Sequence, residues 1–205
     1  MLKKIRSLVL NSNPSFIEVY DNALTKKECG ILISCFDDSK DVLPGKTSGG
    51  YQPEIKKCLE LSCDFRNKSI VTNIIRPTLC KYIDSYADKY VSLDVIHKWK
   101  YFPRYNFQKY EKESDGYKGW HTEHGPDGES RDRIMAWMFY LNNAESGTDF
   151  LHYQTLRAKM GRLVIWPASW THLHRSHLNK GFKYIITGWI SFIEGEYKLP
   201  TSNEK

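Results

Sequence analysis

Apolar residues follow a helical spacing in the first part of the chain. Thr25 and Glu28 have the spacing of a capping box, and apolar residues at helical spacing follow over 31–36. A second helical stretch, whose buried face is redirected at Pro77, is predicted within 68–90. Its apolar face comprises Ile70, Ile74, Leu79, Tyr82, Ile83 and Tyr86. We expect both apolar stripes to belong to the core.

Beyond residue 91 the pattern changes to short β-branched and aromatic runs separated by turn signals. These runs predict strands at 97–102, 134–141, 163–166 and 183–192. The expected fold class is mainly β with flanking helices, built on a double-stranded β-helix, or jelly-roll barrel. We expect a single domain over 1–205. In it, a helical part of about 1–91 packs on an outer face of a jelly-roll core of about 92–193.

The segment 43–50 between the two helical stretches is rich in residues that favour turns. Two interpretations remain open for it. It is either a lid over a site or an ordinary solvated connector.

Composition limits the class of protein. The chain has 205 residues, 40% of them hydrophobic, which suits one sizeable core. The net charge of +6 is compatible with nucleic acid but does not indicate it, because the lysines are scattered among carboxylates. Five cysteines without a C-x-x-C pair argue against a disulfide framework or structural zinc. The apolar run 8–10 is too short for a secretory segment, so we expect a cytoplasmic protein without a membrane partner.

A set of metal-ligating residue types is split between two segments. His121 and Glu123 are two residues apart, so on a strand both point to one face and can converge on an ion. About fifty residues later, His172, His174 and His177 offer a third ligand. Two histidines and one carboxylate form the ligand face of non-haem Fe(II), with open positions left for other ligands. The alternative is that these histidines are solvated or satisfied by hydrogen bonds.

Strand alternation over 183–189 places Lys183, Ile185, Thr187 and Trp189 on one face. If that face points into the barrel, the Lys183 ammonium requires an anion, because an unpaired buried charge is costly. The distal carboxylate of a dicarboxylic acid would satisfy it. The alternative is that Lys183 faces solvent.

Taken together, these segments resemble the 2-oxoglutarate and Fe(II)-dependent oxygenases, particularly the prolyl 4-hydroxylase-like branch that includes many phage and bacterial members. The resemblance covers about 17–192, and the order and spacing of its parts make it specific. Its most specific parts are 120–123, 140–142 with 147–150, 161–167, 174–183 and 187–189.

The resemblance implies a particular ligand set. In the family, the distal histidine precedes the basic carboxylate-binding residue by nine or ten positions, and His174 stands nine before Lys183. This favours His174 over His177 and over His172, which would share a strand face with His174 and stays the main alternative. Glu123 departs from the commoner aspartate. Asp127, in the turn-prone run 125–128, is the alternative carboxylate.

The segment 108–110 resembles the strand whose tyrosine hydroxyl touches 2-oxoglutarate in such enzymes. Tyr110 is therefore the expected contact, with Tyr105 as the alternative if the register slips. Thr187 and Trp189 are expected to line the same cosubstrate pocket as Lys183.

The implied activity is that of a 2-oxoglutarate-dependent dioxygenase that hydroxylates a substrate C–H bond. It would use Fe(II), 2-oxoglutarate and O2, with ascorbate as an optional reductant. The expected substrate is a prolyl or other side chain of a protein or peptide. One alternative is oxidation of a nucleic acid or small metabolite, for which Tyr51, Trp99 and Tyr101 offer rings for base stacking. The other is a non-catalytic jelly-roll binding module. The sequence determines neither the product nor the oligomeric state.

Overall fold

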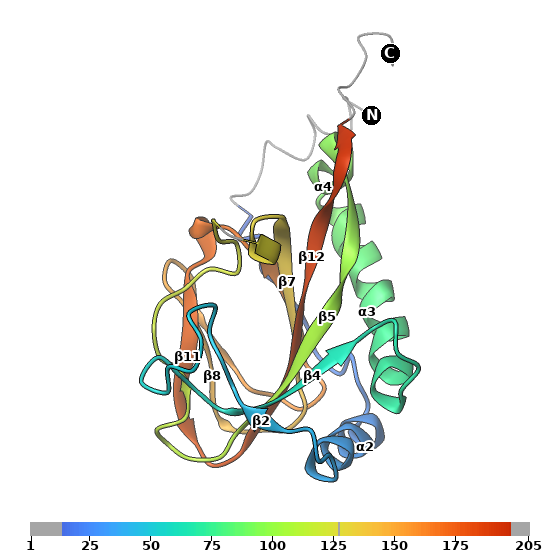
Figure 1. Cartoon of the computed structure of the whole chain (residues 1–205). Helices are drawn as coiled ribbons and strands as arrows, with labels where there is room; N and C mark the ends of the chain where they lie inside the picture. Colours follow the sequence, from blue (N-terminus) through green and yellow to red (C-terminus); the bar gives the residue numbers. More distant parts are fainter. Residues whose placement is uncertain (1–13, 127, 198–205) are drawn as a thin grey trace, which may run out of the picture.

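The computed structural model describes residues 14–126 and 128–197 (Figure 1). Its helices are α2 (Lys26–Asp37), α3 (Ile70–Lys89) and α4 (Ser92–Ile96), with short 3-10 turns η1 (Gly128–Ser130) and η2 (Trp170–His172). Its strands are β1 (Glu18–Tyr20), β2 (Leu43–Pro44), β3 (Lys56–Lys57), β4 (Leu59–Asp64), β5 (His97–Tyr110), β6 (Gly116–Tyr117), β7 (Arg133–Tyr140), β8 (Glu145–Phe150), β9 (Thr155–Arg157), β10 (Leu163–Pro167), β11 (His174–Lys180) and β12 (Lys183–Tyr197).

Two antiparallel sheets form the body of the molecule. The large sheet has the order β1-β10-β7-β12-β5-β4-β2, and the small sheet has the order β11-β8-β9. Figure 1 shows β8 and β11 on one side of the molecule, opposite β7, β12 and β5. A further pair, β3 with β6, adds a short third sheet. This arrangement is the jelly roll that the sequence predicted.

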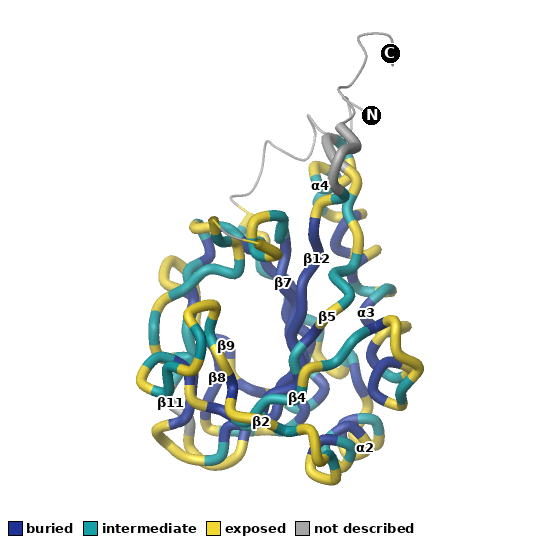
Figure 2. The backbone as a smooth tube through the Cα atoms, viewed as in Figure 1, coloured by how far each residue is buried: buried dark blue, intermediate teal, exposed yellow. Residues whose placement is uncertain are grey.

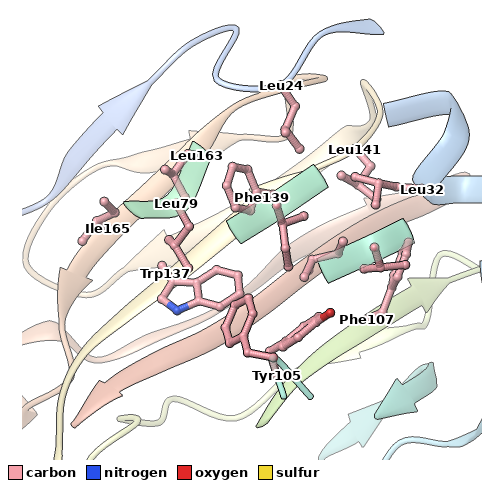
Figure 3. Packing of buried hydrophobic residues seen from close by; sticks show 14 of the residues in the cluster. Leu24, Leu32, Leu79, Tyr105, Phe107, Trp137, Phe139, Leu141, Leu163 and Ile165 are labelled. Carbon is pink, nitrogen blue, oxygen red and sulfur yellow. The ribbon is translucent and has the colours of Figure 1, made fainter. Parts of the chain in front are cut away.

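The helices α2 and α3 cover the outer face of the large sheet (Figure 1). The Thr25 hydroxyl accepts a hydrogen bond from the Glu28 backbone N–H at 3.2 Å, and the Glu28 carboxylate accepts from the Thr25 N–H at 2.8 Å. The capping box therefore starts α2 where the sequence predicted. Figure 3 shows Leu79 of α3 beside Trp137 and Phe139 of β7, and Leu32 of α2 beside Leu141.

Alternate residues of the central strands face opposite sides of the large sheet. Trp137 and Phe139 join the helix-side cluster, whereas Ala136, Met138 and Tyr140 pack with residues of the small sheet. Strands β7 and β12 are mostly buried along the large sheet (Figure 2). The inner face of the sheet is therefore free to build a cavity while its outer face supplies the core.

One helix prediction was wrong in detail. Helix α3 passes through Pro77 without a redirected face, because Val71, Ile75, Leu79 and Ile83 are all buried at steps of four residues. Pro77 lies on the exposed side, where solvent compensates for the missing backbone N–H. Ile70, expected in the buried face, is 59% exposed.

The N-terminal part contributes more than helices. Strands β1, β2 and β4 also join the large sheet, at its two ends. The division of one domain near residue 92 stays a prediction. Within the described residues, no helix combines the length and the apolar character needed to cross a membrane.

Candidate metal and cosubstrate site

A cavity of about 460 Å³ lies between the two sheets. Its walls come from the inner faces of β5, β7 and β12, from β8 and β11 of the small sheet, and from the segments 46–48 and 121–126. The segment 43–50, for which a lid or a connector was considered, thus contributes Lys46, Thr47 and Ser48 to the wall.

The structure brings His121, Glu123 and His174 together at this cavity. The backbones of His121 and His174 exchange two hydrogen bonds of 3.0 Å, which hold the two segments side by side. One ligand atom from each of the three residues lies within 4.8 Å of the others. His174 Nε2 is 3.4 Å from Glu123 Oε1.

Backbone carbonyls fix the orientation of both imidazole rings. The Nδ1 of His121 is 3.0 Å from the Gly119 carbonyl oxygen, and the Nδ1 of His174 is 3.0 Å from the His172 carbonyl oxygen. Because a carbonyl only accepts, each Nδ1 carries a proton, and in the neutral form of each ring Nε2 then presents a lone pair. Two Nε2 lone pairs and Glu123 Oε1 therefore converge as acceptors, an arrangement that a cation satisfies. This donor set fits Fe(II).

The outer oxygen of Glu123 is held by two side chains. Trp189 Nε1 donates a hydrogen bond of 2.7 Å to Oε2, and Arg133 Nη1 lies 3.7 Å from the same oxygen. The Arg133 guanidinium in turn stacks 3.6 Å from the centre of the Trp189 ring. Oε1 is thereby left to face the histidines, which shows how the longer glutamate side chain is accommodated.

Electrostatics at the three residues favour a bound cation. Burial alone would raise the pKa of the Glu123 carboxyl, but a protonated His174 ring, which both donates to the carboxylate and carries a positive charge, lowers that pKa to about 2, and His121 and Arg133 act in the same direction. Burial, followed by the charge of His174, lowers the pKa of His121 to about 4. The carboxylate is ionised and His121 is neutral at pH 7, the protonation states that a metal requires.

Lys183 lies inside the barrel rather than in solvent, and is 2% exposed. Its Nζ donates to the Gly147 carbonyl at 3.4 Å and sits 4.5 Å from the centre of the Tyr110 ring. Among the described residues, no carboxylate is within ion-pair distance of this ammonium. Burial lowers the pKa of Lys183 to about 8. A buried lysine so poorly compensated is suited to an anionic ligand.

The two candidate tyrosines lie on opposite faces of β5. Tyr110 lines the cavity, and its hydroxyl donates to Gln108 Oε1 at 2.7 Å. Tyr105 points to the helix side, where its hydroxyl is 2.9 Å from the Thr72 hydroxyl and its ring packs on Phe65. The structure therefore places Tyr110, and not Tyr105, beside Lys183.

Thr187 and Trp189 also line the cavity, on the same face of β12 as Lys183. The Thr187 hydroxyl donates to the Trp137 carbonyl at 2.9 Å, so its proton is already used within the protein.

The alternative ligands are placed elsewhere. The ring nitrogens of His172 are each 2.8 Å from an oxygen outside the cavity, one of Thr171 and one of Ser15. The Nδ1 of His177 is 2.9 Å from Asp149 Oδ1. The alternative carboxylate, Asp127, lies outside the described residues.

Arg133 was not among the residues predicted from the sequence. Its place directly before the predicted strand 134–141 is a weak signal, because charged residues commonly flank strands. Only the pairing of β7 with β12 shows that it reaches Trp189 and Glu123.

Comparison with known proteins finds a family model that matches part of the chain. Residues 105–191 match the model of the 2OG-Fe(II) oxygenase superfamily. No curated protein matches the sequence.

Solved structures share the fold over nearly the whole chain. A viral collagen prolyl hydroxylase from Paramecium bursaria Chlorella virus-1, in complex with 2-oxoglutarate, has a TM-score of 0.63 at 18% identity, covering 87% of this chain and 97% of its own. A Pseudomonas putida prolyl-4-hydroxylase has a TM-score of 0.62 at 14% identity, covering 93% and 98%. A Trichoplax adhaerens prolyl hydroxylase, in complex with a hypoxia inducible factor peptide fragment, has a TM-score of 0.62 at 15% identity, covering 92% and 90%.

Proposed function

We propose that the chain is an Fe(II)- and 2-oxoglutarate-dependent dioxygenase of the 2OG-Fe(II) oxygenase superfamily, and that it hydroxylates a side chain of a protein or peptide, with a prolyl side chain as the first candidate. The observation that carries the proposal is the position of two separate features in one cavity. Three convergent acceptor atoms suit a metal, and a buried ammonium suits a carboxylate.

The residue roles follow from this geometry. His121, Glu123 and His174 would hold Fe(II) through two Nε2 atoms and Oε1. Lys183 would bind the distal carboxylate of 2-oxoglutarate. Tyr110 would contact the cosubstrate.

Iron held by these residues, with 2-oxoglutarate and O2, would supply the oxidising power: 2-oxoglutarate would yield succinate and carbon dioxide while the substrate gained a hydroxyl group. The protein contributes position and exclusion of water. Phe150 and Trp166 pack around the His174 ring at centroid distances of 5.6 and 5.1 Å, which fixes that ligand in an apolar surround. Trp189 and Arg133 keep Glu123 from rotating.

A peptide substrate is supported by the fold shared with prolyl hydroxylases, one of which was solved with a peptide. The nucleic-acid alternative has less support. Trp99 and Tyr101, considered for base stacking, pack partly buried against the helix-side core. Tyr51 is exposed, but a lone ring gives no stacking platform.

Succinate formation tests the proposal. Protein loaded with Fe(II) without oxygen is given 2-oxoglutarate, O2 and a pool of proline-containing peptides, and peptide masses are followed for the gain of one oxygen atom. We expect His174→Ala to abolish succinate formation and His172→Ala to retain most of it. Succinate without any oxidised peptide would reject the peptide substrate, and loss of activity in His172→Ala alone would reject the ligand set.

A further inference from the structure

Two buried lysines line the cavity, and they differ in their partners. Lys56 is 5% exposed, and its Nζ lies 2.6 Å from Glu60 Oε2 and 3.0 Å from the Lys46 carbonyl oxygen. Lys183, equally buried, reaches no carboxylate among the described residues. Of these two cations, the protein neutralises Lys56 and leaves Lys183 for a ligand.

Glu60 is held firmly between two strands. Its Oε2 also accepts a hydrogen bond of 2.8 Å from Gln108 Nε2, and Glu60 on β4 stands directly opposite Gln108 on β5 in the sheet register. Gln108 Oε1 accepts from the Tyr110 hydroxyl at 2.7 Å. A continuous set of hydrogen bonds thus joins Lys56 to the ring on which Lys183 sits.

Lys56 and Lys183 line the same cavity. Burial raises the pKa of the Cys58 thiol to about 12, and the charges of Lys56 and Lys183 both oppose that rise, so both lysines act on the same thiol. Without Glu60, a dicarboxylate in this cavity could therefore pair with either lysine. A ligand anchored at Lys56 would carry its keto-acid end to a different place in the cavity than a ligand anchored at Lys183.

We propose that Glu60 determines the binding orientation of the dicarboxylate. Resting on the proposed function, the role is to cancel the charge of Lys56, so that Lys183 is the buried lysine that anchors the ligand and the keto acid is directed to the metal ligands. Attraction between unit charges is strong in a poorly solvated cavity, so a second uncompensated lysine would compete effectively.

The test compares two ligands on Fe(II)-loaded protein under nitrogen. Succinate has two carboxylates but no keto group, and its affinity is measured by calorimetry. Productive binding of 2-oxoglutarate is measured by the visible charge-transfer absorption of its chelate with Fe(II). The variant Glu60→Gln removes the charge but keeps an acceptor for Gln108, so it isolates electrostatics from hydrogen bonding.

We expect Glu60→Gln to bind succinate about tenfold more tightly than the wild type and to lose more than half of the charge-transfer absorption at saturating 2-oxoglutarate. Lys56→Met should act in the opposite sense, because it exposes the Glu60 carboxylate, and weaken succinate binding about tenfold. The double variant should return to within about threefold of the wild type. If Glu60→Gln does not fold, the succinate affinities of Lys56→Met and of the double variant are compared instead. Tighter binding of succinate by the double variant would then support the proposal.

Two results would overturn the proposal. One is a succinate affinity in Glu60→Gln within twofold of the wild type. The other is weaker binding of both ligands in both single variants without recovery in the double variant, which indicates a purely structural network. Failure of the proposed function has a different signature, since the wild type itself would then show no charge-transfer absorption and no binding of 2-oxoglutarate.

Discussion

The indole Nε1 of Trp189 donates a hydrogen bond of 2.7 Å to Glu123 Oε2, across the gap between β12 and the segment that carries the ligand. This contact orients one oxygen of a proposed metal ligand away from the metal. Partners of this kind commonly change metal affinity by about 10- to 100-fold.

Trp189→Phe should therefore lower the affinity for Fe(II) by about tenfold. Phenylalanine keeps an aromatic surface for the Arg133 guanidinium, so the loss reports the hydrogen bond rather than the stacking. Metal affinity is measured by competition with a chelator under nitrogen. Thr187→Val is the matched control on the same strand, because its hydroxyl donates to Trp137 and not to a ligand. An equal loss of affinity in the control would show a general disturbance of β12.

Helix α3 offers a stability test with an internal control. Ile75 is fully buried and Ile70 is 59% exposed, five residues apart on the same helix. Ile75→Ala should reduce the free energy of unfolding by about 2–5 kcal/mol, because it removes buried methyl groups and leaves a cavity. Ile70→Ala should change it by no more than about 0.5 kcal/mol. Urea denaturation followed by circular dichroism measures both, and similar values would mean that α3 does not pack as described.

The sequence predicted the elements whose apolar runs are buried on both faces. Strands β7 and β10 were predicted within one residue of their observed bounds for this reason, whereas β12 starts where predicted but continues five residues beyond the predicted end, to Tyr197. The polar segments of β8 and β11 gave no such run. Strand β5 was predicted to end at 102 but continues to Tyr110. The predicted strand stopped before Pro103, because proline is unfavourable inside a strand. The sheet tolerates this proline because the register between β12 and β5 shifts where β5 passes from Tyr101 to Tyr105.

Site residues could be predicted where their spacing along one strand determines which face they share. Alternation alone placed Lys183, Thr187 and Trp189 on one face, and the structure puts all three at the cavity. The roles of Arg133 and Glu60 depend instead on which strands are neighbours and in which register. The order and register of the strands cannot be deduced from the residue pattern of a single sequence.

The two candidate tyrosines of β5 can be separated by the same conservative change. Tyr110→Phe removes a hydroxyl that faces the cavity and leaves Gln108 Oε1 without its donor, so the dissociation constant of 2-oxoglutarate should rise about three- to tenfold. Tyr105→Phe removes a contact with Thr72 on the helix side and should cost about 1 kcal/mol of stability without changing that constant. Calorimetry under nitrogen and thermal denaturation measure the two effects. A larger binding defect in Tyr105→Phe would contradict the assignment of faces.

The affinity for 2-oxoglutarate should fall as pH rises above about 8, the lowered pKa of Lys183 in the ligand-free protein. An ammonium binds the distal carboxylate and a neutral amine does not, so binding above this pH requires uptake of a proton. The dissociation constant should then rise about tenfold per pH unit.

The titratable neighbours of Lys183 do not contribute to this pH dependence of 2-oxoglutarate binding. Burial raises the pKa of the Cys58 thiol to about 12 and that of the Tyr110 phenol well above 10, so both stay neutral between pH 7 and 9. Calorimetry at pH 9 in buffers of different ionisation enthalpy should detect about one proton taken up on binding. Lys183→Arg provides the contrast, because a guanidinium stays charged throughout this range and its affinity, whatever its value, should not vary with pH. A flat profile for the wild type would mean that the carboxylate is held by a group other than Lys183.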